Sequence, residues 1–188
     1  MLYEDLLKRI AEALDREKID YLVIGGQAVL VHGEPRLTRD IDITLTLTPE
    51  DLQKLLKIAG EVGLEVLVND PEEFTGKTWV LPVQSPELGV RVDFVFSSSD
   101  FERQAMQRAL PIGVAGYPVR FASAEDLIIH KIIAGRARDI EDVRGVLSKK
   151  RRGLDVDYIR RWLKEFDDVL NANFSGQFEA LLEEEGGL

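Results

Sequence analysis

The spacing of apolar residues predicts a mixture of helices and short strands in the first two thirds of the chain. Between residues 2 and 18, apolar side chains recur at helical intervals (Leu6, Leu7, Ile10, Ala13 and Leu14). The segment YLVIGG predicts a short buried strand that ends in two glycines, and Gln27 to Gly33 predicts a short helix or turn. Asp40 to Leu47 predicts the next strand, and Thr48 with Pro49 marks the start of another helix.

Three further apolar segments predict strands: Thr78 to Val83, Val90 to Phe96 and Tyr117 to Phe121, with a short one at 65–68. The segment NDPEEFTGKTW has the composition of a loop. Ser99 and Glu102 are spaced as a capping box and predict a helix after the second of these strands.

From Ser123 the pattern is helical to the end of the chain. Ser123 and Asp126 resemble a second cap pair, and breaks are expected near Gly135, Gly153 and 171–175. We therefore expect an α/β (α+β) fold, with a small mixed sheet and flanking helices in residues 1–122 and a helical part in 123–188.

Composition narrows the classes of protein that fit. The 188 residues carry a formal net charge of −10 and no cysteine, which excludes disulfides and cysteine metal sites and argues against a protein that coats nucleic acid. The basic stretch at 148–153, with Arg160 and Arg161, is either a solvated helix end or a local guide for a nucleic-acid acceptor. No apolar run approaches the roughly 20 residues of a membrane span and the start of the chain does not resemble a signal peptide, so we expect a cytoplasmic protein without a membrane partner.

Two acids stand at the head of a strand that is otherwise apolar and β-branched. Because side chains alternate across a strand, Asp40 and Asp42 share one face, and Ile41 and Ile43 share the other. Asp93 has the same setting in the strand RVDFVF. If the two strands pair, three carboxylates converge on one face of the sheet.

Carboxylates that converge in this way are costly unless a cation neutralises them. Three oxygen donors without histidine or cysteine suit Mg²⁺ or Mn²⁺, which can activate an attacking oxygen and stabilise a leaving phosphate. Taken singly, Asp40 is equally explained as a cap and Asp93 as a solvent-facing strand residue. Gly25 and Gly26 end the preceding strand and open a helix, where backbone N–H groups can bind an anion. Neither His32 nor His130 is expected to bind the metal.

These residues together resemble a known family. The stretch GGQAVLVHGEPRLTRDID, followed by VDF about 50 residues on, resembles the nucleotidyltransferases of the DNA polymerase β-like superfamily. The segment SAEDLIIHKIIAGRARDIEDV resembles the abortive-infection type, the toxin half of some bacterial toxin–antitoxin pairs. Many superfamily members carry serine after the first glycine, whereas this chain has Gly26.

The resemblance implies a role for each matching residue. Gly25 and Gly26 would hold the triphosphate, Asp40 and Asp42 would bind the metal, and Asp93 would complete the metal site and act as base. Lys131 would contact the nucleotide with Asp139 as its polar partner. The residues themselves leave Lys131 open, because a lysine within the apolar arc of a helix either faces a phosphate or forms a structural ion pair.

Arginines flank the acids in the sequence. Arg36, Arg39 and Arg91 can each steady a phosphate or offset acidic charge, and we favour Arg36 as a nucleotide-binding residue.

We therefore expect a Mg²⁺-dependent nucleotidyltransferase that moves a nucleotidyl group from an NTP to an acceptor hydroxyl. The acceptor is tRNA, a protein or a small molecule, and the resemblance adds a toxin role with an antitoxin partner. A non-catalytic nucleotide- or partner-binding module and a metal-dependent phosphoester hydrolase are the alternatives.

Overall fold

The computed structural model describes residues 2–38 and 40–186. The chain forms two compact units, which we describe separately. Unit 1 comprises Met1–Gln27 and Thr38–Ala122, and unit 2 comprises Ala28–Leu37 and Ser123–Leu188. Helix α2 (Gly25–His32) begins in unit 1 and continues into unit 2, so the chain enters unit 2 early, returns, and enters it again at Ser123.

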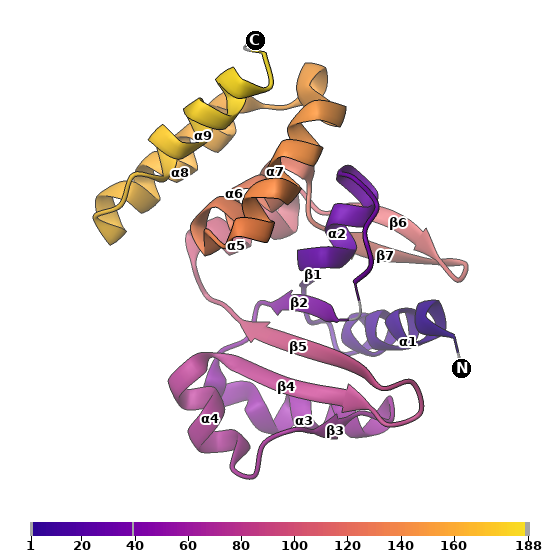
Figure 1. Ribbon diagram of the computed structural model, residues 1–188. Coiled ribbons are helices and arrows are strands. Elements are labelled where there is room, and N and C mark those ends of the chain that lie inside the picture. Colours follow the sequence, from indigo (N-terminus) through magenta and orange to yellow (C-terminus); the bar gives the residue numbers. More distant parts are fainter. Residues whose placement is uncertain (1, 39, 187–188) are drawn as a thin grey trace. The chain divides into compact units, whose positions relative to one another are not determined.

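Unit 1 contains the sheet of the described part of the chain, seven strands in the order β3-β4-β5-β2-β1-β7-β6 (Figure 1). The strands are β1 (Tyr21–Ile24), β2 (Ile41–Leu45), β3 (Glu65–Val66), β4 (Val80–Ser85), β5 (Val90–Phe96), β6 (Leu110–Val114) and β7 (Tyr117–Phe121). The helices are α1 (Tyr3–Arg16), α3 (Leu52–Glu61), α4 (Pro71–Thr78) and α5 (Asp100–Gln107), with a 3₁₀ turn η1 (Pro49–Asp51) before α3. Both β1–β7 and β2–β5 are parallel pairs, whereas the other pairs are antiparallel, so the predicted mixed sheet is confirmed.

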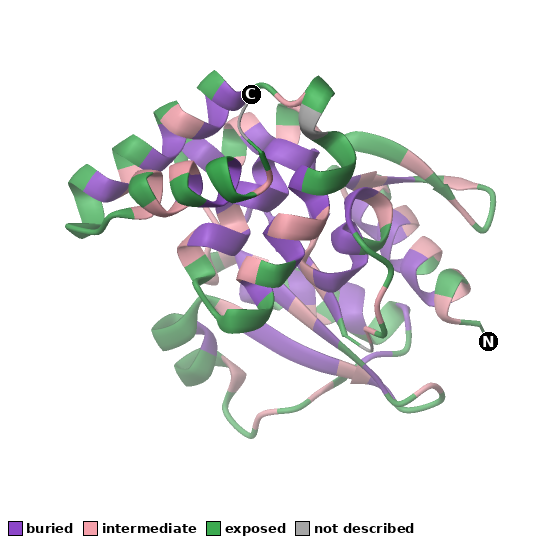
Figure 2. Cartoon of the chain, turned by 45° about the horizontal axis from the view of Figure 1, so that its top comes forward, coloured by how far each residue is buried: buried purple, intermediate pink, exposed green. Residues whose placement is uncertain are grey.

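The centre of the sheet is the core of unit 1. Ile41, Ile43, Val92 and Phe94 are fully buried on one face of the two central strands. Each such side chain contributes roughly 1.5–3 kcal/mol through burial, which fixes the strand register that the alternation requires. Figure 2 shows this buried centre in purple and the partly exposed β6–β7 hairpin in green and pink.

Two predictions for unit 1 need correction. The segment NDPEEFTGKTW is not a loop, since α4 occupies Pro71–Thr78. Asp70 caps this helix by accepting a hydrogen bond from the Glu73 N–H, and Pro71 takes the first helical position, where a missing N–H has no cost. The expected strand at Thr78 consequently begins at Val80 instead. The edge strand β6 was not predicted, because Pro111 and Gly113 are poor strand formers that sheet edges tolerate.

Unit 2 is helical. It contains α6 (Ala124–Ala134), α7 (Ala137–Lys150), the 3₁₀ turn η2 (Arg151–Gly153), α8 (Val156–Leu170) and α9 (Phe174–Glu184). The predicted cap is confirmed, since Ser123 Oγ accepts a hydrogen bond from the Asp126 N–H, and the predicted break falls at Gly135, whose φ is +63°. None of the helices in the described ranges is long and apolar enough to cross a membrane.

Candidate functional site

Two of the three predicted acids lie directly beside each other on the sheet. Strands β2 and β5 run parallel, and Asp42 is the Cα partner of Asp93. Both side chains are partly exposed, whereas the neighbours Ile41 and Ile43 on β2 are buried. The predicted pairing of the two strands is thus confirmed, and it places two carboxylates on one solvent-accessible face.

Asp40 lies just outside the ladder. β1 pairs with β2 as far as Ile24 and Asp42, and the chain then turns into α2 at Gly25, so Asp40 is exposed coil before β2. Its backbone carbonyl oxygen is contacted by side chains instead, with the Tyr3 hydroxyl at 3.5 Å and Gln27 Nε2 at 3.4 Å. Tyr3 and Gln27 were not predicted as parts of the site, although Gln27 directly follows the glycine pair.

The glycine pair is required by close packing around the acids. Gly25 has φ +62°, and a Cβ at this position would lie 1.9 Å from Asp42 Oδ2. A Cβ on Gly26 would lie 2.3 Å from Thr38 Oγ1. A side chain at either position would therefore displace Asp42 or Thr38. The two glycines thus allow the loop and the strand that carry the acids to pack closely against the start of α2. Thr38 also escaped prediction, although it belongs to the R-x-T-x-D-I-D motif.

Two side chains near the acids, Arg91 and Tyr3, have shifted pKa values. Arg91 Nε lies 2.9 Å from Asp93 Oδ1, and this hydrogen bond, with the nearby charges of Asp40 and Asp42, raises the pKa of Arg91. Burial of the Tyr3 phenol, with the charges of Asp42 and Asp40, raises the pKa of Tyr3. Asp40 and Asp42 therefore act on both side chains, and Asp93 acts on Arg91.

The type of donor and the strand register fit a hard cation such as Mg²⁺ or Mn²⁺. The side chains as they stand do not form a finished cage: across residues 2–38 and 40–186, no three histidine, cysteine or acidic side chains are grouped as a metal site requires. Asp93 Oδ1 instead accepts a hydrogen bond from Arg91 Nε. The metal roles of Asp40, Asp42 and Asp93 therefore stay predictions.

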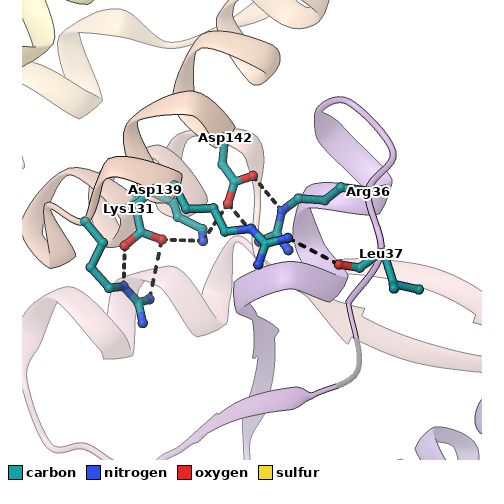
Figure 3. Close-up of polar contacts among 7 residues, drawn as sticks. Arg36, Leu37, Lys131, Asp139 and Asp142 are labelled. Carbon is teal, nitrogen blue, oxygen red and sulfur yellow. Dashed lines mark hydrogen bonds and ion pairs between the residues drawn. The ribbon is translucent and has the colours of Figure 1, made fainter.

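The remaining predicted site residues lie in unit 2, in a cluster of ion pairs around the buried side chains of Lys131, Asp139 and Asp142 (Figure 3). Lys131 Nζ lies 2.6 Å from Asp139 Oδ1 and 2.8 Å from Asp142 Oδ2, and its side chain is 6% exposed. Arg36 binds the two oxygens of Asp142 through Nε at 2.7 Å and Nη2 at 2.9 Å. Arg136 Nε lies 2.6 Å from Asp139 Oδ2. Two carboxylates and three cations thus satisfy one another.

The cluster depresses the pKa values of both its acids. Burial would raise the pKa of Asp139, but the hydrogen bonds from Arg136 and Lys131 outweigh burial and lower it. Burial likewise opposes the hydrogen bonds that Asp142 accepts from Arg36 and Lys131, and its pKa is also lowered. The structural ion pair is therefore what the structure shows for Lys131, with Asp139 as its partner as predicted. A nucleotide contact for Lys131, Asp139 or Arg36 stays a prediction.

Asp142 was not predicted as a member of the cluster. The available signal was its position three residues after Asp139, on the same side of α7. Its second partner, Arg36, is 106 residues away in the sequence, and no local pattern indicates that pair. Arg39 lies outside the described residues.

Two cations of the basic stretch, Lys149 and Arg160, bind groups within unit 2. Lys149 Nζ donates a hydrogen bond to the Gly33 carbonyl oxygen at 2.9 Å and lies 3.3 Å from Glu34 Oε1. Arg160 binds both carboxylate oxygens of Glu179, at 2.6 and 2.9 Å. These contacts agree with the interpretation of the stretch as an ordinary helix end.

Comparison with known proteins gives one family match. The model of the family described as "Nucleotidyltransferase of unknown function (DUF6036)" matches residues 2–181. No curated protein sequence matches the chain significantly.

Solved structures share the fold. The antibiotic-resistance factor ANT(2″)-Ia is 18% identical, with a TM-score of 0.59 over 96% of this chain and 95% of that chain. A crystal structure of ANT(2″)-Ia holds adenylyl-2″-tobramycin. The lincosamide antibiotic adenylyltransferase LnuA is 18% identical, with a TM-score of 0.54 over 77% of this chain and 96% of that chain. A nucleotidyltransferase-like protein from Paracoccidioides brasiliensis is 20% identical, with a TM-score of 0.53 over 77% and 73%.

Proposed function

The chain belongs to this family of nucleotidyltransferases of unknown function, and from that premise we propose that it transfers a nucleotidyl group from an NTP to an acceptor hydroxyl. The observation that carries the proposal is the register of Asp42 beside Asp93, with Gly25 packed against Asp42. Two neighbouring carboxylates on an exposed sheet face do not stabilise the fold, because like charges directly opposite each other destabilise a pair of strands.

The proposed reaction uses these residues as follows. The NTP lies with its phosphates at the start of α2, which opens with Gly25 and Gly26 and where the first backbone N–H groups of a helix lack partners within the helix. Asp40, Asp42 and Asp93 would hold the divalent cation, which when bound neutralises the charge that develops on the phosphates. Asp93 accepts the proton of the acceptor hydroxyl, whose oxygen forms a bond to the α-phosphorus. The bond from the α-phosphorus to the bridging oxygen breaks, and pyrophosphate leaves.

The net charge of the chain bears on which class of acceptor it uses. Long RNA acceptors are usually held by many phosphate contacts. Here the net charge is −10, and Lys149 and Arg160 of the basic stretch are engaged with groups of the chain itself. We therefore favour a hydroxyl on a small molecule or a protein over tRNA. ANT(2″)-Ia, which shares the fold, has a crystal structure in complex with adenylyl-2″-tobramycin, a small molecule that carries an adenylyl group.

The test is incubation with each α-³²P-labelled NTP, Mg²⁺ and a cell extract separated into small-molecule, protein and RNA fractions. Label is expected on the small-molecule or protein fraction with wild type and not with Asp42→Ala. Label on RNA would overturn the acceptor class but not the reaction. Tight NTP binding without transfer to any fraction would favour the non-catalytic module, and release of inorganic phosphate from simple esters would favour the hydrolase.

The toxin role implied by the resemblance is a narrower prediction. It expects that induced expression of the wild-type chain stops growth and that Asp42→Ala removes this effect. Unchanged growth with active enzyme would exclude it.

A further inference from the structure

Arg91 lies on strand β5 beside Asp93, whose partner on β2 is Asp42. It shares a strand face with Asp93, two residues away, and its Nε lies 2.9 Å from Asp93 Oδ1. In the β2–β5 register, Asp40 and Arg91 each directly precede the partners Ile41 and Val92. The charges of Asp40 and Asp42 act on the guanidinium together with that of Asp93.

We propose that Arg91 is the internal counter-ion of the acid face, the sheet face that carries Asp42 and Asp93. Arg91 must release Asp93 for a divalent cation to bind, and it then contacts the phosphates of the NTP. The proposal rests on the function proposed above. It assigns to Arg91 a positioning role first and a substrate contact second.

The exposure of the pair supports an exchangeable contact rather than a structural one. The Arg91 side chain is 51% exposed and that of Asp93 is 21% exposed. Ion pairs this accessible to water contribute little to stability, so a divalent cation can displace the guanidinium at small cost. The buried Lys131 side chain, 6% exposed, marks the opposite case within the same chain.

The chemistry of the guanidinium supports the second step. A released arginine keeps its charge and presents a planar fork of donors that fits phosphate oxygens. Because Arg91 stays on the same strand as Asp93, a released side chain remains beside the acids that hold the cation.

The test compares Arg91→Met with Arg16→Met. Arg16 forms a similarly exposed ion pair with Glu61 in unit 1, with side chains 58% and 40% exposed, and so controls for the loss of a surface pair. Binding of Mn²⁺ alone is followed by the electron paramagnetic resonance signal of the free ion. Affinity for a non-hydrolysable NTP analogue is then measured on the Mn²⁺-loaded protein.

Arg91→Met is expected to tighten Mn²⁺ binding by about two- to five-fold. It is expected to weaken binding of the analogue by about tenfold or more, because a charge-assisted hydrogen bond to phosphate is lost. Arg16→Met should change neither value. Arg91→Lys, which keeps the charge but not the fork, should bind Mn²⁺ like wild type and the analogue with intermediate affinity.

Equal or weaker Mn²⁺ binding by Arg91→Met would overturn the counter-ion. Tighter Mn²⁺ binding with unchanged analogue affinity would overturn the phosphate contact. Neither measurement depends on turnover, so absence of nucleotidyl transfer to any acceptor would count against the proposed function and leave the Mn²⁺ result standing.

Discussion

Two clusters of aspartates in this chain differ chiefly in what surrounds them. In unit 1, Asp42 and Asp93 lie side by side on a partly exposed sheet face, and their visible counter-ion is a half-exposed arginine. In unit 2, Asp139 and Asp142 are buried and each accepts hydrogen bonds from two cations. The same residue type therefore occurs in two settings. The water-accessible acids have a counter-ion that, under our proposal, a divalent cation displaces, whereas the buried acids form ion pairs that join α6 to α7.

The largest effect is expected from removal of an acid on the exposed face. Asp42→Asn should lower the rate of nucleotidyl transfer by about 10³-fold or more, because charge stabilisation in the transition state is lost. The free energy of unfolding should stay within about 0.5 kcal/mol of wild type or rise, since a like-charge neighbour of Asp93 is removed. Transfer assays and urea unfolding measure the two quantities. A large loss of stability would place Asp42 in the same class as the unit 2 acids.

The matching change in unit 2 should behave in the opposite way. Asp142→Ala leaves Lys131 and Arg36 without this shared carboxylate, and we expect the free energy of unfolding to fall by roughly 3–5 kcal/mol. Urea unfolding gives the value, and the exposed pair variant Lys164→Met serves as the control with little change expected. A variant that unfolds like wild type but has lost NTP affinity would instead support a nucleotide role for this cluster.

Sequence patterns indicated members of both clusters but not all of the contacts within them. Strand alternation and helix caps follow from local rules. The sequence left the pairing of the strands of Asp42 and Asp93 conditional, because these strands are distant in the chain, and the register establishes it. The position of Asp40 outside the ladder was not predictable, because it depends on β1 turning into α2 at Gly25. The ion pair between Arg36 and Asp142 depends on tertiary packing. Helix α4 was not predicted, because its first residues suit turns as well as helix starts.

An intermediate effect is expected at the first glycine. Gly25→Ala should lower the transfer rate by about 10²-fold, because a Cβ placed 1.9 Å from Asp42 Oδ2 must displace that carboxylate. The left-handed backbone adds about 1–2 kcal/mol of strain, visible as reduced stability in urea. Gly113→Ala is the control, since a Cβ there meets nothing within 4 Å. Full activity in Gly25→Ala would show that the position of Asp42 is not critical.

The smallest effect concerns acid sensitivity. The pKa values of Asp139 and Asp142 are lower in the folded protein than in the unfolded chain, where aspartate has a pKa of about 3.9. Their stabilisation is therefore fully present above that value and is lost as pH falls through the lowered folded pKa. The free energy of unfolding of wild type should decline below about pH 4, and Asp142→Asn should flatten this decline. Urea unfolding between about pH 2.5 and 7, which spans the protonated and ionised forms of the two aspartates, measures how steeply the free energy of unfolding changes with pH. Equal slopes for the two proteins would contradict the assignment.

Nucleotidyl transfer at the exposed acid face is tested most directly by the stoichiometry of the reaction. The acceptor is first purified from the extract fraction that takes up label. It is then incubated with an α-³²P-labelled NTP and Mg²⁺, and pyrophosphate and labelled acceptor are measured in the same sample. We predict equal amounts of the two with wild type, and neither with Asp93→Asn at matched, folded concentration. Pyrophosphate or inorganic phosphate released without labelled acceptor, or undiminished transfer by Asp93→Asn, would contradict the assignment of this face as the site of nucleotidyl transfer.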